Sequence, residues 1–153
     1  MFATLTLSQQ SNAMQQDPQP GQVFLYRDFP FEDGPAADKL FVILYVADIN
    51  SPCLFVKTTS QSTRYAGVEE GCNPQKRVFF VPLDWREGFP LDTYIQLPQI
   101  FEKSAAEIFA GTLSKRIFLK NALSADCFAR LKSCLKQFRK DISQEHWQLI
   151  FRS

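Results

Sequence analysis

The chain contains one histidine, His146, and four cysteines, none of which form a Cys-x-x-Cys pair. A structural zinc site needs about four such ligands at close spacing, so we predict no metal and no cofactor. No disulfide framework is visible. Cys127 and Cys134 lie seven residues apart in a helical pattern, where both would face the core as small hydrophobic side chains. We therefore expect reduced cysteines and a cytoplasmic protein.

Long hydrophobic runs are also missing. The longest, residues 40–47, is far shorter than the roughly 20 apolar residues of a membrane span, so no membrane partner is predicted. The first residues lack the basic segment that opens a signal peptide. Both absences agree with the cytoplasmic assignment.

No charge of one sign dominates, because 17 Lys and Arg residues stand against 16 Asp and Glu residues. The net charge of +1 gives no general argument for a nucleic-acid partner. The distribution is uneven, since residues 113–153 contain nine Lys or Arg and three Asp or Glu. This basic segment is either a solvated helix face or a phosphate-binding surface, and both interpretations stay open.

The chain does contain short hydrophobic runs separated by turn residues, within a length typical of one domain. Residues 8–20 are polar, and residues 1–20 are predicted to be a disordered or tag-like tail, whereas residues 21–153 are predicted to form a single domain. Strands are expected at 22–29, 40–47, 53–59, 77–83, 93–97 and 117–119. The segment 60–76 is expected to be a loop. Pro82 and Pro98 place the neighbouring strand ends at sheet edges.

A short helix or turn and one longer helix are predicted. Ser104 and Glu107 have the spacing of a capping box, with Gly111 as a candidate helix end. A clearer amphipathic helix follows Ser124 and covers residues 125–138. His146 lies beyond it and is interpreted as an exposed tail residue. The expected fold is therefore mainly β with a C-terminal helix, arranged as a small antiparallel barrel.

The order of several short motifs resembles the PemK/MazF-like toxin family. Residues 21–33 read Gly-Gln-Val-Phe-Leu-Tyr-Arg-Asp-Phe-Pro-Phe-Glu-Asp, and a later strand ends in Thr-Thr-Ser-Gln at 58–61. Leu-Pro-Gln-Ile at 97–100 and Gly-Thr-Leu-Ser at 111–114 follow in the family's order, so the resemblance covers residues 21–138. It implies an SH3-like barrel of the PemK/MazF/CcdB kind that forms a homodimer. It also implies a type II toxin that cleaves single-stranded RNA without a metal and is neutralised by a cognate antitoxin.

The resemblance also implies site residues. Thr59 matches the family's catalytic threonine, but the family's Arg-Pro pair falls on Leu40 and Phe41, so the nearest cation, Lys39, becomes the second catalytic candidate. The expected RNA-binding residues are Lys57, Ser60, Gln61, Arg64 and Arg27, and Tyr65 is a candidate for stacking on a base. An arginine from elsewhere, Arg27 or Arg64, could supply the missing guanidinium.

Each catalytic candidate also has a purely structural interpretation. Lys39 could be a solvated residue at a strand start, and Thr59 an ordinary strand-end hydroxyl. Two functions therefore stay open. The first is a metal-independent endoribonuclease, in which a 2′-hydroxyl attacks the adjacent phosphorus. The second is a catalytically inactive SH3-like barrel that binds a protein partner. The Thr-Ser-Gln segment favours the first, and the missing arginine favours the second.

Overall fold

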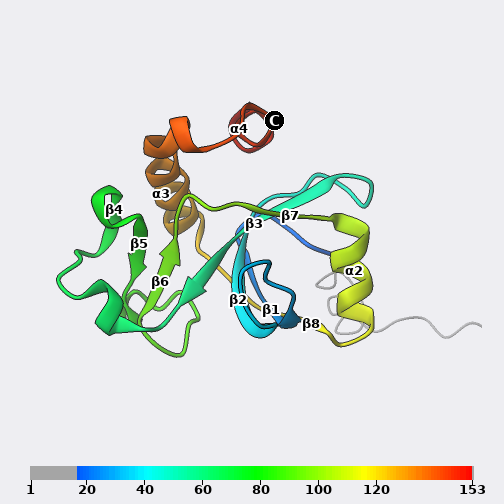
Figure 1. Cartoon of the computed structure of the whole chain (residues 1–153), viewed down its shortest axis with the longest axis horizontal. Coiled ribbons are helices and arrows are strands. Elements are labelled where there is room, and N and C mark those ends of the chain that lie inside the picture. Colours follow the sequence, from blue (N-terminus) through cyan, green and yellow to red (C-terminus); the bar gives the residue numbers. More distant parts are fainter. Residues whose placement is uncertain (1–16, 153) are drawn as a thin grey trace, which may run out of the picture.

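The computed structural model describes residues 17–152, which form an antiparallel sheet with helices packed against it (Figure 1). Residues 1–16, most of the predicted tail, lie outside the described residues. The strands are β1 (Gln22–Phe29), β2 (Ala37–Tyr45), β3 (Pro52–Thr59), β4 (Gly71–Asn73), β5 (Val78–Val81), β6 (Thr93–Gln96), β7 (Phe101–Ser104) and β8 (Ile117–Ala122). The α-helices are α2 (Ala105–Leu113), α3 (Ala125–Leu135) and α4 (Gln144–Arg152), and the 3-10 helices are η1 (Ser62–Tyr65), η2 (Pro74–Lys76), η3 (Leu83–Trp85) and η4 (Lys136–Asp141).

The predicted strands are confirmed, with changes at their ends. β1 has the predicted bounds, and Phe41 to Leu44 of β2 are all buried, as expected for a strand covered on both faces. The predicted loop at 60–76 instead contains η1, β4 and η2. β7 was not predicted, because its four residues alternate too briefly to signal a strand.

β3 is the strand at which the sheet changes direction. Residues 52–55 pair with β7 and residues 54–57 with β2, whereas Thr58 and Thr59 pair with β6. The order is β4-β5-β6-β3-β2-β1-β8, and within residues 17–152 the end strands β4 and β8 do not pair with each other. The mainly antiparallel fold is therefore confirmed, but the sheet stays open. β5 and β6 are both interior strands, so the edge positions predicted from Pro82 and Pro98 are wrong.

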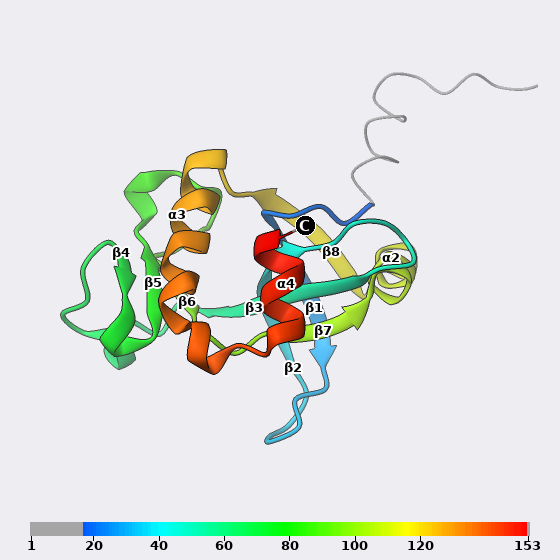
Figure 2. The ribbon, with the colours of Figure 1, turned by 90° about the horizontal axis from the view of Figure 1, so that it is seen from above.

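Two hydrophobic cores lie on opposite faces of this sheet. The first packs α3 and α4 against the strands, with Leu131, Leu135 and Ile150 buried beside Val42 and Val56. The second contains buried aromatic rings from β1, β2 and β3, which α2 covers through Ile108. Figure 2 looks down on the first face, where α3 runs beside β5 and α4 lies over the β1 to β3 region. The helices thus fix the curvature of the sheet from both sides.

The predicted helix starts are confirmed. The Ser104 hydroxyl accepts a hydrogen bond from the Glu107 N–H at 3.1 Å, and the Ser124 hydroxyl accepts one from the Cys127 N–H at 3.1 Å. Gly111 lies inside α2 and does not end it. A Cβ at this position would lie 2.5 Å from Ile117 Cδ1, so no larger residue fits there without a shift. Close packing of β8, not capping, explains this glycine.

The C-terminal segment differs more from the prediction. α3 ends at Leu135, and Phe138 has non-helical dihedrals inside η4. His146, expected to be an exposed tail residue, lies in α4, and the Ser143 hydroxyl accepts a hydrogen bond from its N–H at 3.1 Å. Trp147 and Ile150 of α4 are buried in the first core. The tail interpretation of His146 is therefore wrong.

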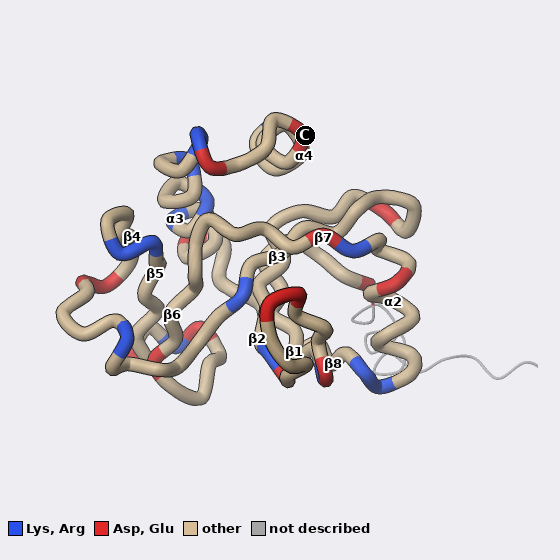
Figure 3. The backbone as a smooth tube through the Cα atoms, viewed as in Figure 1, with Lys and Arg blue, Asp and Glu red and all other residues tan. Residues whose placement is uncertain are grey.

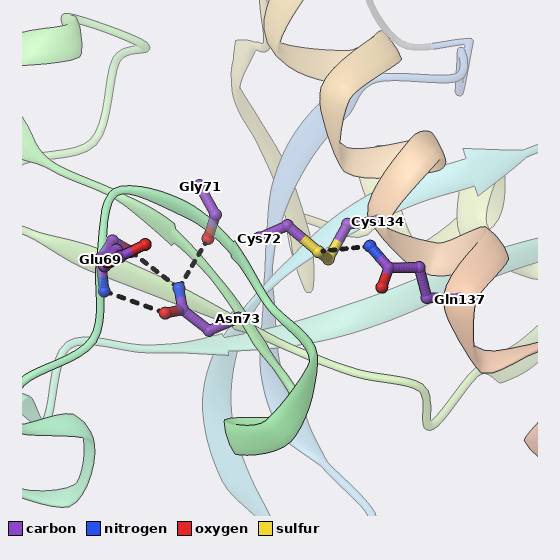
Figure 4. The surroundings of a disulfide bond; sticks show 6 residues. All are labelled: Glu69, Gly71, Cys72, Asn73, Cys134 and Gln137. Carbon is purple, nitrogen blue, oxygen red and sulfur yellow. Dashed lines mark hydrogen bonds between the residues drawn. A yellow bond between two sulfur atoms is a disulfide. The ribbon is translucent and has the colours of Figure 1, made fainter.

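A disulfide joins Cys72 of β4 to Cys134 of α3, with the Cα atoms 5.4 Å apart (Figure 4). The amide Nε2 of Gln137 donates to Cys72 Sγ at 3.4 Å. Asn73 holds the turn beside it, because its side chain bonds to both the N–H and the carbonyl of Glu69. The expectation of reduced cysteines is wrong for this pair. Cys127 is free and buried, as predicted.

Across residues 17–152, no helix combines the length and the apolar character that crossing a membrane requires.

Candidate nucleic-acid interface

Three cations predicted from the sequence come together at the bend of β3. Burial lowers the pKa of Lys39 on β2, and the positive charges of Lys57 and Arg64 lower this pKa further. Within the described part of the chain, no salt bridge neutralises any of these three side chains. We call Lys39, Lys57 and Arg64 the cation cluster. Uncompensated positive charge of this kind favours a phosphate ligand.

One side of the cation cluster opens into a hollow of about 310 Å³ that contains Lys39, Thr59, Ser60 and Gln61, here called the Thr59 groove. Thr59 is 9% exposed, and its Oγ1 accepts a hydrogen bond from the Gln61 N–H at 3.2 Å. This bond leaves the hydroxyl proton free to be donated to a ligand. The neighbouring Thr58 hydroxyl instead donates to the Leu40 carbonyl at 3.0 Å and has a structural role.

The other side of the cluster opens into a larger cleft of about 670 Å³, here called the basic cleft. Lys57, Arg64, Lys76 and Arg77 line it together with polar groups of the C-terminal segment, Asp141, Ser143 and His146. Figure 3 shows Lys and Arg positions on β3 and beside β4 and β5; Lys57 of β3 lines the cleft, as do Lys76 and Arg77 in the connection from β4 to β5. Four cationic side chains thus face this cleft against one carboxylate among the described residues, that of Asp141.

The sequence placed Lys57 and Thr59 on one face of β3, but they line different hollows. The reason is the change of pairing partner after Lys57, since Lys57 pairs with Phe41 of β2 and Thr58 with Ile95 of β6. The simple alternation of an unbent strand does not hold there. The predicted site is thus divided between two adjoining hollows.

Two predicted residues do not take the roles expected of them. Arg27 is exposed on β1 and lines neither hollow; its carbonyl accepts a hydrogen bond from Arg116 Nε at 3.3 Å. Tyr65 lines the basic cleft but is only 9% exposed, with its ring stacked on that of Tyr94 at a centroid distance of 5.2 Å. The Tyr65 hydroxyl accepts from Gln96 Nε2 at 2.9 Å. Its ring is therefore used in the fold and is not an open platform for a base.

The positions of the family's Arg-Pro pair carry no charge. Leu40 is half-buried and borders the Thr59 groove, whereas Phe41 is fully buried in the aromatic core. Arg64 is the one guanidinium in the cation cluster. Arg64 can therefore supply the planar, bidentate phosphate contact that Leu40 cannot.

Sequence reasoning missed the pair formed by His146 and Glu102. His146 Nε2 lies 2.8 Å from Glu102 Oε1, which links α4 to β7. Buried Trp147 and Ile150 lie three residues apart, which is the signal that would have revealed a helix there. Lys76 and Arg77 were also missed, because they precede a strand and gave no motif of their own.

Residues 17–152 contain no group of three or more His, Cys, Asp or Glu side chains placed to hold a metal ion. Neither a protein-family model nor a curated protein sequence matches the chain.

Proposed function

We propose that the protein is a metal-independent endoribonuclease that cleaves single-stranded RNA, as a toxin of a type II toxin-antitoxin system. The observation that carries the proposal is the uncompensated cation cluster, which lies between the Thr59 groove and the basic cleft. Negatively charged phosphates would relieve the mutual repulsion of Lys39, Lys57 and Arg64. The family resemblance supplies the reaction class.

Each residue of the cluster has a separate task in this proposal. Arg64 and Lys57 hold the phosphate oxygens, because a guanidinium and an ammonium both stabilise the charge of the phosphorane. Lys39 donates a proton to the departing 5′-oxygen, and its lowered pKa makes that donation easier. Thr59 donates its free hydroxyl proton to a phosphate oxygen. Ser60 and Gln61, both exposed beside Thr59, contact the RNA backbone.

Two observations also support the second function, a catalytically inactive barrel that binds a partner protein. A catalytically inactive barrel would need no arginine in place of Leu40, and the hydrogen bond from Gln61 to Thr59 is also ordinary strand-end chemistry. In this alternative the protein binds a partner protein and cuts nothing. The two functions differ in one result, the cleavage of RNA by the purified chain.

The fold proposed with this function is the SH3-like barrel of the family that the sequence resembles. The proposed partner is a cognate antitoxin that covers the RNA site, and the proposed location is the cytoplasm. Thiol reductants act in the cytoplasm, so assays should be run with the Cys72–Cys134 bond both intact and reduced.

A homodimer is expected, because Phe31 and Phe101 pack on the aromatic core yet stay partly exposed, and large aromatic side chains are typical of dimer interfaces. Static light scattering of the purified chain at micromolar concentration should give twice the chain mass. The mass of a single chain would contradict the dimer.

RNA cleavage is the direct test of the proposed function. The purified protein should cut an unstructured RNA oligonucleotide in excess chelator and leave a 2′,3′-cyclic phosphate and a 5′-hydroxyl. Thr59→Ala should slow single-turnover cleavage about 100-fold, since a transition-state hydrogen bond is lost. Lys39→Met should slow it by a similar factor, because the proton donor is lost.

Matched variants complete this test. Thr59→Ser keeps the hydroxyl and should cut at nearly the wild-type rate. Lys39→Arg keeps the positive charge, but arginine is a poorer proton donor, so this variant should cut more slowly than the wild type. Lys120→Ala removes an exposed cation of β8 that lines neither hollow, and its rate should not change. A wild-type protein that cuts no RNA pool, with or without a thiol reductant, would overturn the proposed function in favour of the partner-binding alternative.

A further inference from the structure

We infer that His146 is the general base of the proposed cleavage reaction and that Glu102 is its positioning residue. The inference rests on the proposed function and deepens it, because the cation cluster contains no proton acceptor, and Asp38, the carboxylate that lines the Thr59 groove, already accepts a hydrogen bond from the Asp28 N–H at 2.9 Å. Lys39, Lys57 and Arg64 are cations, and Thr59 is a weak base. The basic cleft offers two further candidates, Asp141 and His146, and His146 is the one whose ring is held by a carboxylate partner.

The contact between His146 and Glu102 determines which imidazole nitrogen can act as a base. Nε2 lies 2.8 Å from the Glu102 carboxylate. An ionised carboxylate only accepts hydrogen bonds, so Nε2 carries the proton. In the neutral ring Nδ1 then has the free lone pair, and the carboxylate stabilises the imidazolium that forms after proton transfer. The arrangement is that of a histidine prepared to accept a proton.

The placement of His146 fits this task. Its side chain is 21% exposed, so the ring is held by packing while still reaching solvent, and it lines the basic cleft. Lys57 and Arg64 of the cation cluster line the same cleft. We place the reacting phosphate on these two cations, where the basic cleft adjoins the Thr59 groove, so that His146 faces it from the cleft while Lys39 and Thr59 face it from the groove. α4 is anchored through Trp147, which is buried directly beside His146 in the chain.

The reaction balances with these groups alone. The 2′-O–H bond breaks and its proton moves to Nδ1 of His146, while the 2′-oxygen forms a bond to phosphorus. The P–O5′ bond breaks, and the 5′-oxygen takes a proton from Lys39. The products are a 2′,3′-cyclic phosphate and a 5′-hydroxyl, and proton exchange with water returns His146 and Lys39 to their starting states.

A structural role for the pair is the competing explanation, because the contact also ties α4 to β7. The test therefore needs measurements that a structural tie would not affect. His146→Ala should slow single-turnover RNA cleavage about 100-fold. Its affinity for an oligonucleotide with 2′-deoxyribose at the cleavage site should change less than about threefold, since that ligand binds but lacks the attacking hydroxyl. Free imidazole added to His146→Ala should restore at least about a tenth of the wild-type rate.

Three further variants sharpen the test. His146→Gln keeps much of the side-chain volume and should be as slow as His146→Ala while folding normally. Glu102→Gln keeps an oxygen that accepts from Nε2, so it should cut faster than Glu102→Ala, which leaves the ring unoriented. Glu145→Ala, an exposed neighbour on α4 outside the cleft, should cut at the wild-type rate.

Two results would overturn the assignment alone. One is cleavage of RNA by both His146→Ala and His146→Gln at the wild-type rate. The other is a slow variant that imidazole does not restore and whose oligonucleotide affinity falls in proportion to its rate. Failure of the wild-type protein to cut RNA would overturn the proposed function and this inference together, so the two failures are distinguishable.

Discussion

Phe41→Ala is expected to lower the free energy of unfolding by about 4 kcal/mol, because it leaves a large cavity in the aromatic core. Phe41 is fully buried on β2. Its ring centroid lies 4.9 Å from those of Phe29 and Phe55 and 5.5 Å from that of Phe24. The lost contacts therefore involve three strands at once. The surrounding rings are too rigid and too closely packed to fill the space.

Urea denaturation followed by circular dichroism measures this loss. Phe118→Ala on β8 is the matched control, since Phe118 is the same residue type but only partly buried and lies outside the buried cores. The control should lose about 1 kcal/mol or less. Equal losses for the two variants would show that the aromatic core does not carry the stability assigned to it.

Opening the Cys72–Cys134 disulfide is expected to lower the free energy of unfolding by about 4 kcal/mol, because the bond closes a long segment of the unfolded chain. The two cysteines are 62 residues apart. Burial raises the pKa of the free thiols Cys53 and Cys127 to about 12, so both stay protonated and unreactive. Exchange with either of them is therefore not expected to obscure the effect.

The measurement compares urea denaturation with and without dithiothreitol for the wild type and for Cys72→Ser. Cys72 is the better position to change, because it is partly exposed, whereas Cys134 is buried. Dithiothreitol should destabilise the wild type and leave Cys72→Ser unchanged. An equal effect of the reductant on both proteins would contradict the prediction.

The strands and helix starts could be predicted because their signals are local. β1 is marked by a run of hydrophobic residues and ends near a cluster of turn residues, and Ser104 and Ser124 cap helices through bonds to residues three positions on. Features that depend on distant pairing could not be predicted. The disulfide joins residues far apart in sequence, and the open sheet results from the change of partner along β3.

In the candidate site, too, some features could be predicted from local signals and others depend on distant pairing. Lys39 and Thr59 come from two strands that the sequence placed next to one another, and they do meet in the Thr59 groove. The division into two hollows depends on the bend of β3. His146 reaches the basic cleft only because Trp147 and Ile150 bring α4 back onto the sheet. Composition alone contains no information about that return of the chain.

The Cys72–Cys134 bond also gives the molecule a covalent topology that differs from its chain order. Residues 72–134 form a closed ring that contains β5, β6, β7, α2 and β8, while β1, β2 and β3 lie outside it. A protease cut inside the ring, as beside the exposed Leu91, leaves one covalently connected molecule. A cut beside the exposed Ile49 releases two fragments. On a nonreducing gel the strand that carries Thr59 would therefore stay with the ring after either cut, because β3 follows Ile49 and precedes the ring.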